Sequence, residues 1–248
     1  MRFKDERVHS VADVLAALKK QTKPRQHTWF RGQSDVSWKL VPSLARQSSH
    51  LPAERALIKR FMQNATPYLH PPPQEEWEWM FLMQHHRAYT RLLDWTESPL
   101  AALYFAVSSE RSITHPAAVW CLDPIALNGA ANLKFEFEAE IPAFGRDALL
   151  QNYLPSRVFD NPAQLQPIAI IGPRNTARMA AQLGTFTINH RLHAPIEEIG
   201  EGAHVWRWII PARYKKNLAR ELRLLGFTSL TLFPELDKVA DLSRELLS

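Results

Sequence analysis

The chain has 248 residues, of which 46% are hydrophobic and 22% are charged, a composition typical of a globular protein with a sizeable core. It has 30 lysine and arginine residues and 25 aspartate and glutamate residues, so its formal net charge is +5. That charge permits a phosphate-bearing partner without requiring one. No apolar run approaches the ~18–20 residues that span a bilayer, and the first residues lack the apolar region of a secretory signal. We therefore expect a cytoplasmic protein with no membrane partner.

The scarcity of glycine and cysteine argues against several kinds of functional site. There are 8 glycines and one cysteine, Cys121, so an intramolecular disulfide and a cysteine-rich zinc site are excluded. The glycine-rich phosphate-binding motifs, the zinc-protease motif and the nucleophile elbow are all missing from the sequence. His85 and His86 are adjacent, and on a helix they would point about 100° apart, which is unsuited to one shared metal. We expect no metal site and no required cofactor.

Apolar periodicity, capping residues and breakers predict the elements in chain order. The N-terminal half is predicted to contain a helix at 10–20, strands at 28–32 and 38–44, helices at 52–69 and 75–89, a helix at 98–109 and a strand at 117–122. The C-terminal half is predicted to contain strands at 135–140 and 167–173, a helix at 174–182, strands at 185–188 and 205–210, and helices at 213–225 and 235–247.

These elements predict an α+β fold. The helix at 98–109 is apolar on every side, which is typical of a buried central helix. Neither an internal repeat nor a long linker divides the chain. We expect one domain spanning residues 1–248, with a mixed β-sheet flanked by helices around that central helix.

A first polar cluster lies at the end of the first predicted strand. Arg31 precedes Gly32, and a glycine there leaves room for a ligand or for another backbone to come close. The arginine fork suits a phosphate or a carboxylate, and Gln33 adds amide hydrogen bonds. The structural alternative is an arginine that pins the strand through a buried carboxylate.

A second polar cluster runs from the end of the helix predicted at 75–89 to the start of the helix predicted at 98–109. It contains Gln84, His85, Thr90, Arg91 and Asp94. Neighbouring leucine and tryptophan side chains would anchor this connector inward, and polar groups held beside a core must find partners. We expect Arg91 and Asp94 either to pair with each other or to bind a ligand. We also expect Arg31 to lie within side-chain reach of this connector.

These clusters resemble the FRG domain, a family named after its Phe-Arg-Gly motif. The resemblance runs from about residue 10 to residue 245. It rests on Phe30-Arg31-Gly32-Gln33, Pro42-Ser43-Leu44 with Arg46, Gln84-His85, the stretches 90–96, 98–100 and 102–106, Arg178 with Gln182, Gly184 and Phe186, Lys215 with Glu221-Leu222, and Leu232-Phe233-Pro234 with Leu236. Where the family usually has a glycine two residues after the histidine, this chain reads His-Arg-Ala-Tyr at 86–89, so we expect a different turn. The resemblance implies a bacterial or phage-associated intracellular domain and a candidate site, without specifying a reaction.

Our leading functional hypothesis is an enzyme that uses a phosphate-bearing nucleotide, with NAD as its substrate. Phe30-Arg31-Gly32 is similar to the opening motif of one branch of the ADP-ribosyltransferases, which also have a late catalytic glutamate. The candidate catalytic residues are Asp94, Gln182 and Glu221, the last two as replacements for that glutamate. The candidate ligand-binding residues are Arg31, Gln33, Arg46, Gln84, His85, Thr90 and Arg91.

Two other functions remain open from the sequence. The basic pairs Lys19-Lys20 and Lys215-Lys216, together with Arg213, favour a domain that binds or cleaves nucleic acid. The third hypothesis is a module without catalysis, in which the same clusters recognise a protein or a small ligand. Convergence of Arg31, Gln84, Arg91, Asp94 and Gln182 on one open cleft would favour ligand binding. The sequence does not indicate an oligomeric state.

Overall fold

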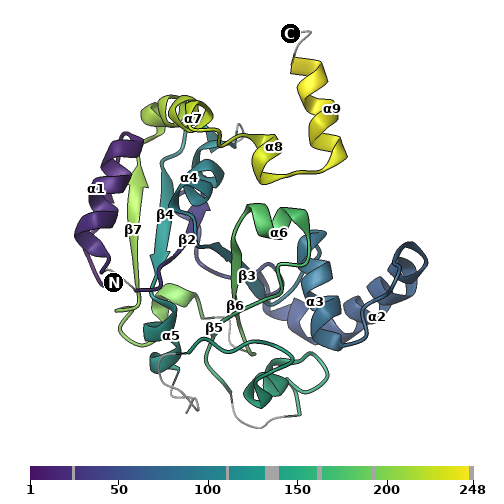
Figure 1. Ribbon diagram of the computed structural model, residues 1–248. Coiled ribbons are helices and arrows are strands. Elements are labelled where there is room, and N and C mark those ends of the chain that lie inside the picture. Colours follow the sequence, from purple (N-terminus) through teal and green to yellow (C-terminus); the bar gives the residue numbers. More distant parts are fainter. Residues whose placement is uncertain (24–25, 110–111, 132–139, 161–163, 192–193, 246–248) are drawn as a thin grey trace.

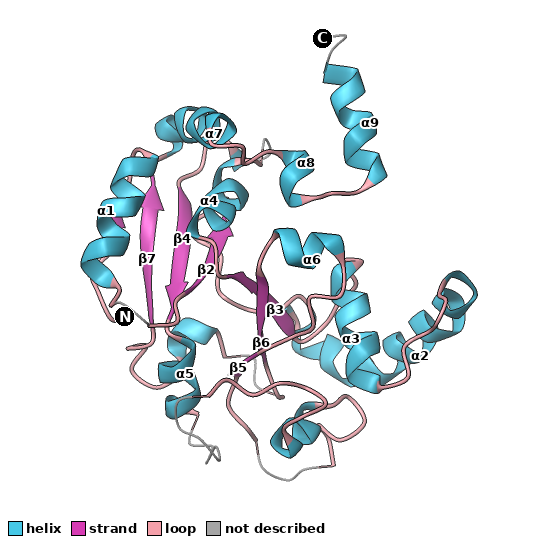
Figure 2. Cartoon of the chain, in the orientation of Figure 1, coloured by secondary structure: helices cyan, strands magenta, loops and turns pink. Residues whose placement is uncertain are grey.

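A seven-stranded mixed sheet forms the centre of the protein in a computed structural model, which describes residues 1–23, 26–109, 112–131, 140–160, 164–191 and 194–245. Only β1 and β7 pair in parallel, and the other neighbours are antiparallel. In spatial order the strands are β1 (Glu6–Arg7), β7 (Val205–Ile210), β4 (Ala117–Leu122), β2 (Trp29–Gln33), β3 (Leu92–Thr96), β6 (Gly184–Ile188) and β5 (Ile168–Ile170). Figure 2 shows β7, β4 and β2 side by side.

Helices surround this sheet, and the predicted α+β class is confirmed. The helices are α1 (Val11–Gln21), α2 (Glu54–Ala65), α3 (Glu76–His85), α4 (Pro99–Val107), α5 (Pro124–Ala130), α6 (Ala177–Ala181), α7 (Lys215–Leu224), α8 (Ser229–Leu232) and α9 (Leu236–Glu245). Figure 1 shows α1, α4 and α7 beside β7, β4 and β2, whereas α3 and α6 lie beside β3 and β6. Within the described part of the chain, no helix is both long and apolar enough to cross a membrane.

Local capping explains where two of these helices begin. The Ser10 hydroxyl accepts a hydrogen bond from the backbone N–H of Asp13 at the start of α1. The Ser98 hydroxyl does the same for Ala101, and Pro99 occupies the first position of α4. Both starts were predicted, because a cap depends on residues within one turn of the chain.

Four predicted elements differ from the structure. Residues 38–44 form no strand, and the segment treated as a connector contains β3, whose exposed Asp94 stands between buried leucine and tryptophan side chains. No helix is predicted directly after the strand at 117–122, but α5 begins there with Asp123 as its N-cap. The helix predicted at 174–182 is reduced to the five residues of α6. The strand predicted at 135–140 falls outside the described residues, except for Glu140.

The side chains of the sheet alternate between two faces, and three apolar clusters cover them. On one face, one cluster packs β2, β4 and β7 against α1, α4 and α7, and a second packs β3, β5 and β6 against α3 and α6. The third cluster covers the opposite face and contains Trp29, Trp95 and Trp120. Trp206 and Trp208, two residues apart on β7, share the face of the first cluster.

Helix α4 packs directly on β2. Its residues Ala102, Leu103 and Ala106 are fully buried, as its apolar sequence predicted. A Cβ atom added to Gly32 would lie 1.9 Å from the Ala102 carbonyl oxygen and 2.6 Å from the Ala106 nitrogen. The glycine therefore makes room for another backbone, which is one of the two roles that the sequence allowed.

Candidate functional site

The two halves of the sheet are joined weakly where β2 meets β3. These strands share a single aligned pair, Phe30 with Thr96, whereas β2 pairs with β4 and β3 pairs with β6 over five residues each. Beyond that pair, Arg31 and Gly32 on β2 diverge from Asp94 and Trp95 on β3. A pocket opens between them, at the boundary between the first and second apolar clusters.

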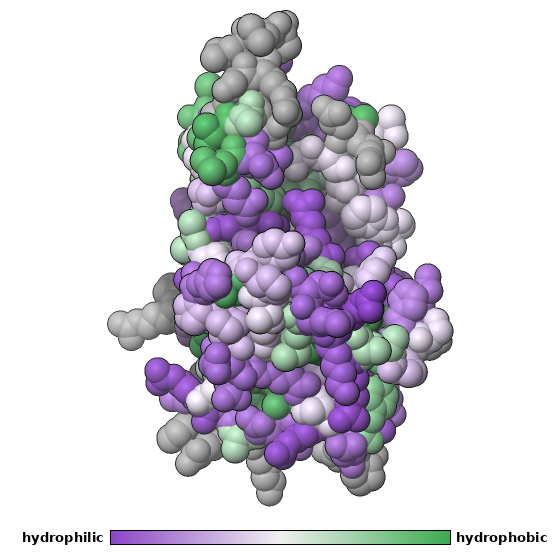
Figure 3. Space-filling view, turned by 90° about the vertical axis from the view of Figure 1, so that its right-hand side faces the viewer, coloured by the Kyte–Doolittle hydropathy of each residue, from purple (hydrophilic) through white to green (hydrophobic). Residues whose placement is uncertain are grey.

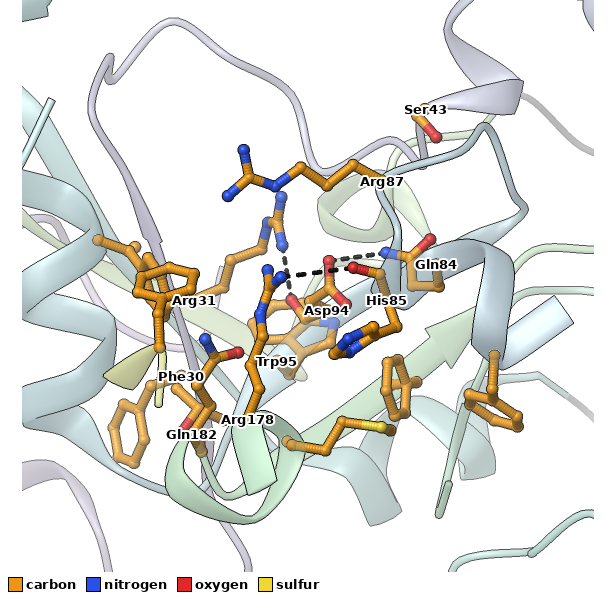
Figure 4. Close-up of a pocket in the computed structure, with 18 of the residues that line it drawn as sticks. Phe30, Arg31, Ser43, Gln84, His85, Arg87, Asp94, Trp95, Arg178 and Gln182 are labelled. Atoms are coloured by element: carbon orange, nitrogen blue, oxygen red, sulfur yellow. Dashed lines mark hydrogen bonds between the residues drawn. The ribbon is translucent and has the colours of Figure 1, made fainter. Parts of the chain in front are cut away.

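The pocket has a volume of about 460 Å³, within the range of ~300–1,000 Å³ typical of small-molecule sites. Its wall is rich in aromatic and apolar side chains, and its charged side chains are three arginines and one aspartate. The aromatic residues are Phe30, Trp38, Phe81, Trp95, Phe105, Phe186 and Phe233, and the charged residues are Arg31, Arg87, Arg178 and Asp94. Figure 4 shows the three arginines gathered around Asp94.

A chain of hydrogen bonds orients the Asp94 carboxylate. The Thr90 hydroxyl donates to the Gln84 side-chain oxygen, and the Gln84 amide nitrogen donates to Asp94 Oδ2 over 2.7 Å. The Asp94 side chain is exposed although it sits on an interior strand of the sheet. The polar connector thus presents one positioned carboxylate to the pocket, while Thr90 is buried and acts through Gln84.

Arg31 lies across the opening from this carboxylate. Its terminal nitrogen donates to the Asp94 backbone oxygen over 2.7 Å, which confirms that Arg31 lies within reach of the connector. Its buried Nε–H has no hydrogen-bond partner among the described residues. Burial lowers the pKa of the Arg31 guanidinium and the Asp94 charge raises it, while Arg46 adds a smaller lowering effect. An arginine stays protonated under such influences, so Arg31 is a cation with an unused donor.

The segment before α9 closes another side of the pocket. Arg178 lies 4.8 Å from the centre of the Phe233 ring and 3.7 Å from the Glu235 carboxylate. The Gln182 amide nitrogen donates to the Leu232 carbonyl over 2.9 Å. Gln182 thus lines the pocket as predicted, and its side chain also holds the C-terminal segment in place.

His85 lines the pocket at the end of α3. Burial lowers its pKa most, the charges of Arg178 and His86 lower it further, and Glu235, at 3.9 Å, opposes them. The imidazole is therefore neutral at pH 7 and able to donate one hydrogen bond and to accept one. A bound anion would favour its protonation.

Arg87 was not predicted as a site residue. It ends α3 in a left-handed conformation, with φ of 60°, the conformation that glycine usually adopts after a helix. The Ala88 N–H donates to the Met83 carbonyl and the Arg87 N–H donates to the Gln84 carbonyl, a Schellman arrangement. We expected a different turn where the family usually has a glycine, but Arg87 adopts the backbone conformation that is typical of glycine.

Arg178 was also missed as a site residue, although it belongs to a motif quoted for the family resemblance. It stands four residues before Gln182, a spacing that places two side chains on one face of a helix. That spacing was a usable signal. The aromatic wall carried no local signal, because its residues are spread along the chain from Phe30 to Phe233 and each lies in a different element or loop.

The prediction that Arg91 pairs with Asp94 or binds a ligand is wrong. Arg91 is fully buried, and its Nε donates to both oxygens of Glu54 over 2.8 and 2.7 Å. Its terminal nitrogens donate to the backbone oxygens of Asn189 and Tyr153. Arg91 and Asp94 are three residues apart on an extended strand, so their side chains point to opposite faces.

Three more candidates lie outside the pocket wall. Glu221 accepts a hydrogen bond from the Val11 N–H, 2.7 Å away, so it holds the start of α1 and is not a catalytic residue of this pocket. Gln33 is buried and accepts from the Trp120 indole N–H over 2.8 Å, which makes it structural. Arg46 is exposed and acts on Arg31 only through its charge.

One of the basic residues that favoured nucleic acid is not on the surface. Lys215 is fully buried and its ammonium donates to the carbonyl oxygens of Ser34 and Ser112, each 2.7 Å away. It is therefore unable to reach a phosphate backbone. Among the described residues, no group of three or more histidine, cysteine, aspartate or glutamate side chains is placed to hold a metal ion.

Comparison with known families identifies part of this chain. Residues 26–114 match the family model described as FRG domain, which confirms the resemblance for that segment. The matched segment contains Arg31, Gln84 and Asp94 but ends before Arg178 and Gln182. Comparisons with curated proteins and with solved structures found no match.

Proposed function

We propose that the pocket between β2 and β3 binds a phosphate-bearing ligand that also has an aromatic ring, a nucleotide. The observation that carries this proposal is the combination of three arginines and one carboxylate on an otherwise aromatic wall. Guanidinium groups bind phosphate through paired hydrogen bonds, and aromatic faces stack on a base. The unpaired Nε–H of Arg31 supports the proposal, because a buried donor without a partner is costly unless a ligand satisfies it.

Within this proposal, NAD is the ligand of first choice and Asp94 is the catalytic candidate. Breaking the bond between ribose and nicotinamide builds positive charge on the sugar, and a positioned carboxylate stabilises such charge. The bond to nicotinamide breaks and nicotinamide leaves with the bonding electron pair, while an acceptor O–H or N–H group forms the new bond to the sugar and releases its proton to solvent. Gln84 would hold Asp94 in place during this step.

The binding test is calorimetric titration of NAD and of a short oligonucleotide. We expect the wild type to bind NAD. Arg31→Ala should abolish binding, and Arg31→Lys should weaken it because lysine keeps the charge but lacks the fork. Since Arg31 makes no buried ion pair, both variants should melt near the wild-type temperature. Arg46→Ala is the matched control, because Arg46 is an exposed arginine outside the pocket wall, and it should bind normally.

Different outcomes separate the competing functions. If the protein bound the oligonucleotide but not NAD, the proposal of a nucleotide pocket would be wrong and a nucleic-acid-binding function would be favoured. Binding of neither ligand, with a large drop in the melting temperature of Arg31→Ala, would leave a structural or protein-recognition role. Catalysis is measured as release of nicotinamide from NAD, which Asp94→Asn should abolish while NAD binding persists.

A further inference from the structure

Arg87 combines an unfavourable backbone conformation with a position on the pocket wall. An L-residue with φ near 60° is strained, and glycine relieves that strain at the C-terminal turn of a helix. The same conformation occurs at Leu183, with φ of 47°, directly after α6. Of these two residues, Arg87 lines the pocket and Leu183 does not.

The Arg87 guanidinium has no protein partner. It makes no hydrogen bond or ion pair with any described residue, whereas Arg178 is paired with Glu235. Its charge acts on another cation, because burial lowers the pKa of the Arg178 guanidinium most and the nearby Arg87 charge lowers it further. The positive charge that Arg87 brings to this wall is therefore not neutralised by an ion pair with any described residue.

Arg31 and Arg87 stand on opposite sides of the pocket. Arg31 comes from β2 and Arg87 from the turn between α3 and β3, and Figure 4 shows their side chains extending toward one another above Asp94. Arg31 uses one donor on the Asp94 backbone oxygen and leaves its buried Nε–H free. Two guanidinium groups thus line one cavity, and neither has all of its donors paired within the described chain. One guanidinium group binds one phosphoryl group through paired hydrogen bonds, so two guanidinium groups suit a diphosphate.

We propose that Arg87 is a ligand-binding residue that selects a nucleoside diphosphate over a monophosphate, one phosphoryl group lying on Arg31 and the other on Arg87. This inference rests on the proposed function. It explains why an arginine stands where a glycine would be less strained. The left-handed backbone conformation of Arg87 lowers the stability of the fold, but its side chain contributes to ligand binding. The ligand class includes dinucleotides joined through a diphosphate, such as NAD.

The test compares adenosine, AMP and ADP by calorimetric titration against the wild type, Arg87→Gly and the matched control Leu183→Gly. The wild type should bind ADP about tenfold or more tightly than AMP, because charged hydrogen bonds contribute more than ordinary ones. Arg87→Gly should lose that preference and leave AMP affinity within about twofold. Leu183→Gly should keep the preference. Arg87→Lys should fall between the wild type and Arg87→Gly.

Melting temperatures supply an independent readout. The melting temperature of both glycine variants should equal that of the wild type or exceed it by up to about 2–4 °C. Each substitution removes the strain of a non-glycine residue in the left-handed conformation. Wild-type preference for ADP that survives in Arg87→Gly would overturn the role of Arg87 and leave the nucleotide pocket standing. A wild type that binds neither ADP nor AMP would overturn both proposals.

Discussion

Arg87 and Arg91 are four residues apart in the chain, and their surroundings give them opposite roles. Arg91 is fully buried, and its donors are matched by the Glu54 carboxylate and by two backbone oxygens. Arg87 is exposed on the pocket wall and has no partner in the described chain. A buried charge is tolerated only with partners, so Arg91 stabilises the fold while Arg87 is available to a ligand.

Removing Arg91 should therefore destabilise the protein strongly. Arg91→Ala leaves the Glu54 carboxylate buried and uncompensated, and we expect the free energy of unfolding to fall by about 3–5 kcal/mol. Urea denaturation followed by circular dichroism measures this loss. Arg46→Ala is the exposed control and should change the free energy by about 0.5 kcal/mol or less. A loss below about 1 kcal/mol for Arg91→Ala would mean that Glu54 finds another partner.

At the scale of elements, the junction of β2 and β3 creates the pocket. Their single aligned pair leaves the strands free to diverge, while α4 holds β2 from one face. The close approach at Gly32 keeps α4 against the strand. Phe105 on the same helix reaches the pocket wall and contacts Phe233 edge to face, with ring centres 5.8 Å apart. The position of α4 therefore affects both the core and the site.

Gly32→Ala should disrupt this contact. The added methyl group would overlap the backbone of α4, and backbone yields less easily than a side chain. We expect a loss of ~3 kcal/mol or more, at the upper end of the range for overpacking. Gly129→Ala in α5 is the matched control, because its Cβ meets nothing within 4 Å. In a helix that change should be neutral or stabilising by about 0.5–1 kcal/mol. Equal stability of the two variants in urea would contradict the packing argument.

At the scale of the whole molecule, buried histidines link stability to pH. His190 is fully buried, its Nδ1 accepts from the Leu165 N–H, and burial, with smaller effects of Arg91 and Arg191, lowers its pKa from 6.5 to about 4. The unfolded chain therefore binds more protons than the folded chain between these values. The contribution of His190 is present above pH 6.5 and is lost as the pH falls toward 4.

We expect the free energy of unfolding to fall between pH 7 and pH 4, with His190 contributing up to roughly 3 kcal/mol of the loss. Urea titrations at several pH values measure the slope. His190→Asn removes the titrating group and should flatten the profile. Burial also lowers the pKa of His204, so part of the slope should remain in the variant. An unchanged slope in His190→Asn would contradict this assignment.

The exterior differs from the pocket in character. Figure 3 shows that hydrophilic side chains cover much of the face to the right of Figure 1, and that hydrophobic side chains gather toward its top. Helix α9 projects from the body of the protein in Figure 1, and its Leu236 and Val239 are exposed. The aromatic side chains of the pocket, in contrast, lie inside the junction of the two sheet halves.

The sequence by itself determined the elements whose signals are local. Ser10, Ser98 and Pro99 mark the starts of α1 and α4, and the apolar runs at 117–122 and 205–210 correspond to β4 and β7. These features depend on contacts within one helical turn or on alternation along one strand. The two polar clusters around Arg31 and Asp94 were also readable, because polar residues beside apolar anchors require partners.

Only the tertiary structure decided what those partners are. Arg91 finds Glu54, 37 residues earlier, and Asn189, 98 residues later, and no local pattern specifies either contact. Strand β3 was missed because an exposed aspartate in a central strand makes sense only once the pocket exists. The conformation of Arg87 and the aromatic wall likewise depend on how distant segments meet. The role of each side chain at this site depends on its burial and on the charges around it. Both depend on residues that are distant in the sequence and meet only in the folded protein.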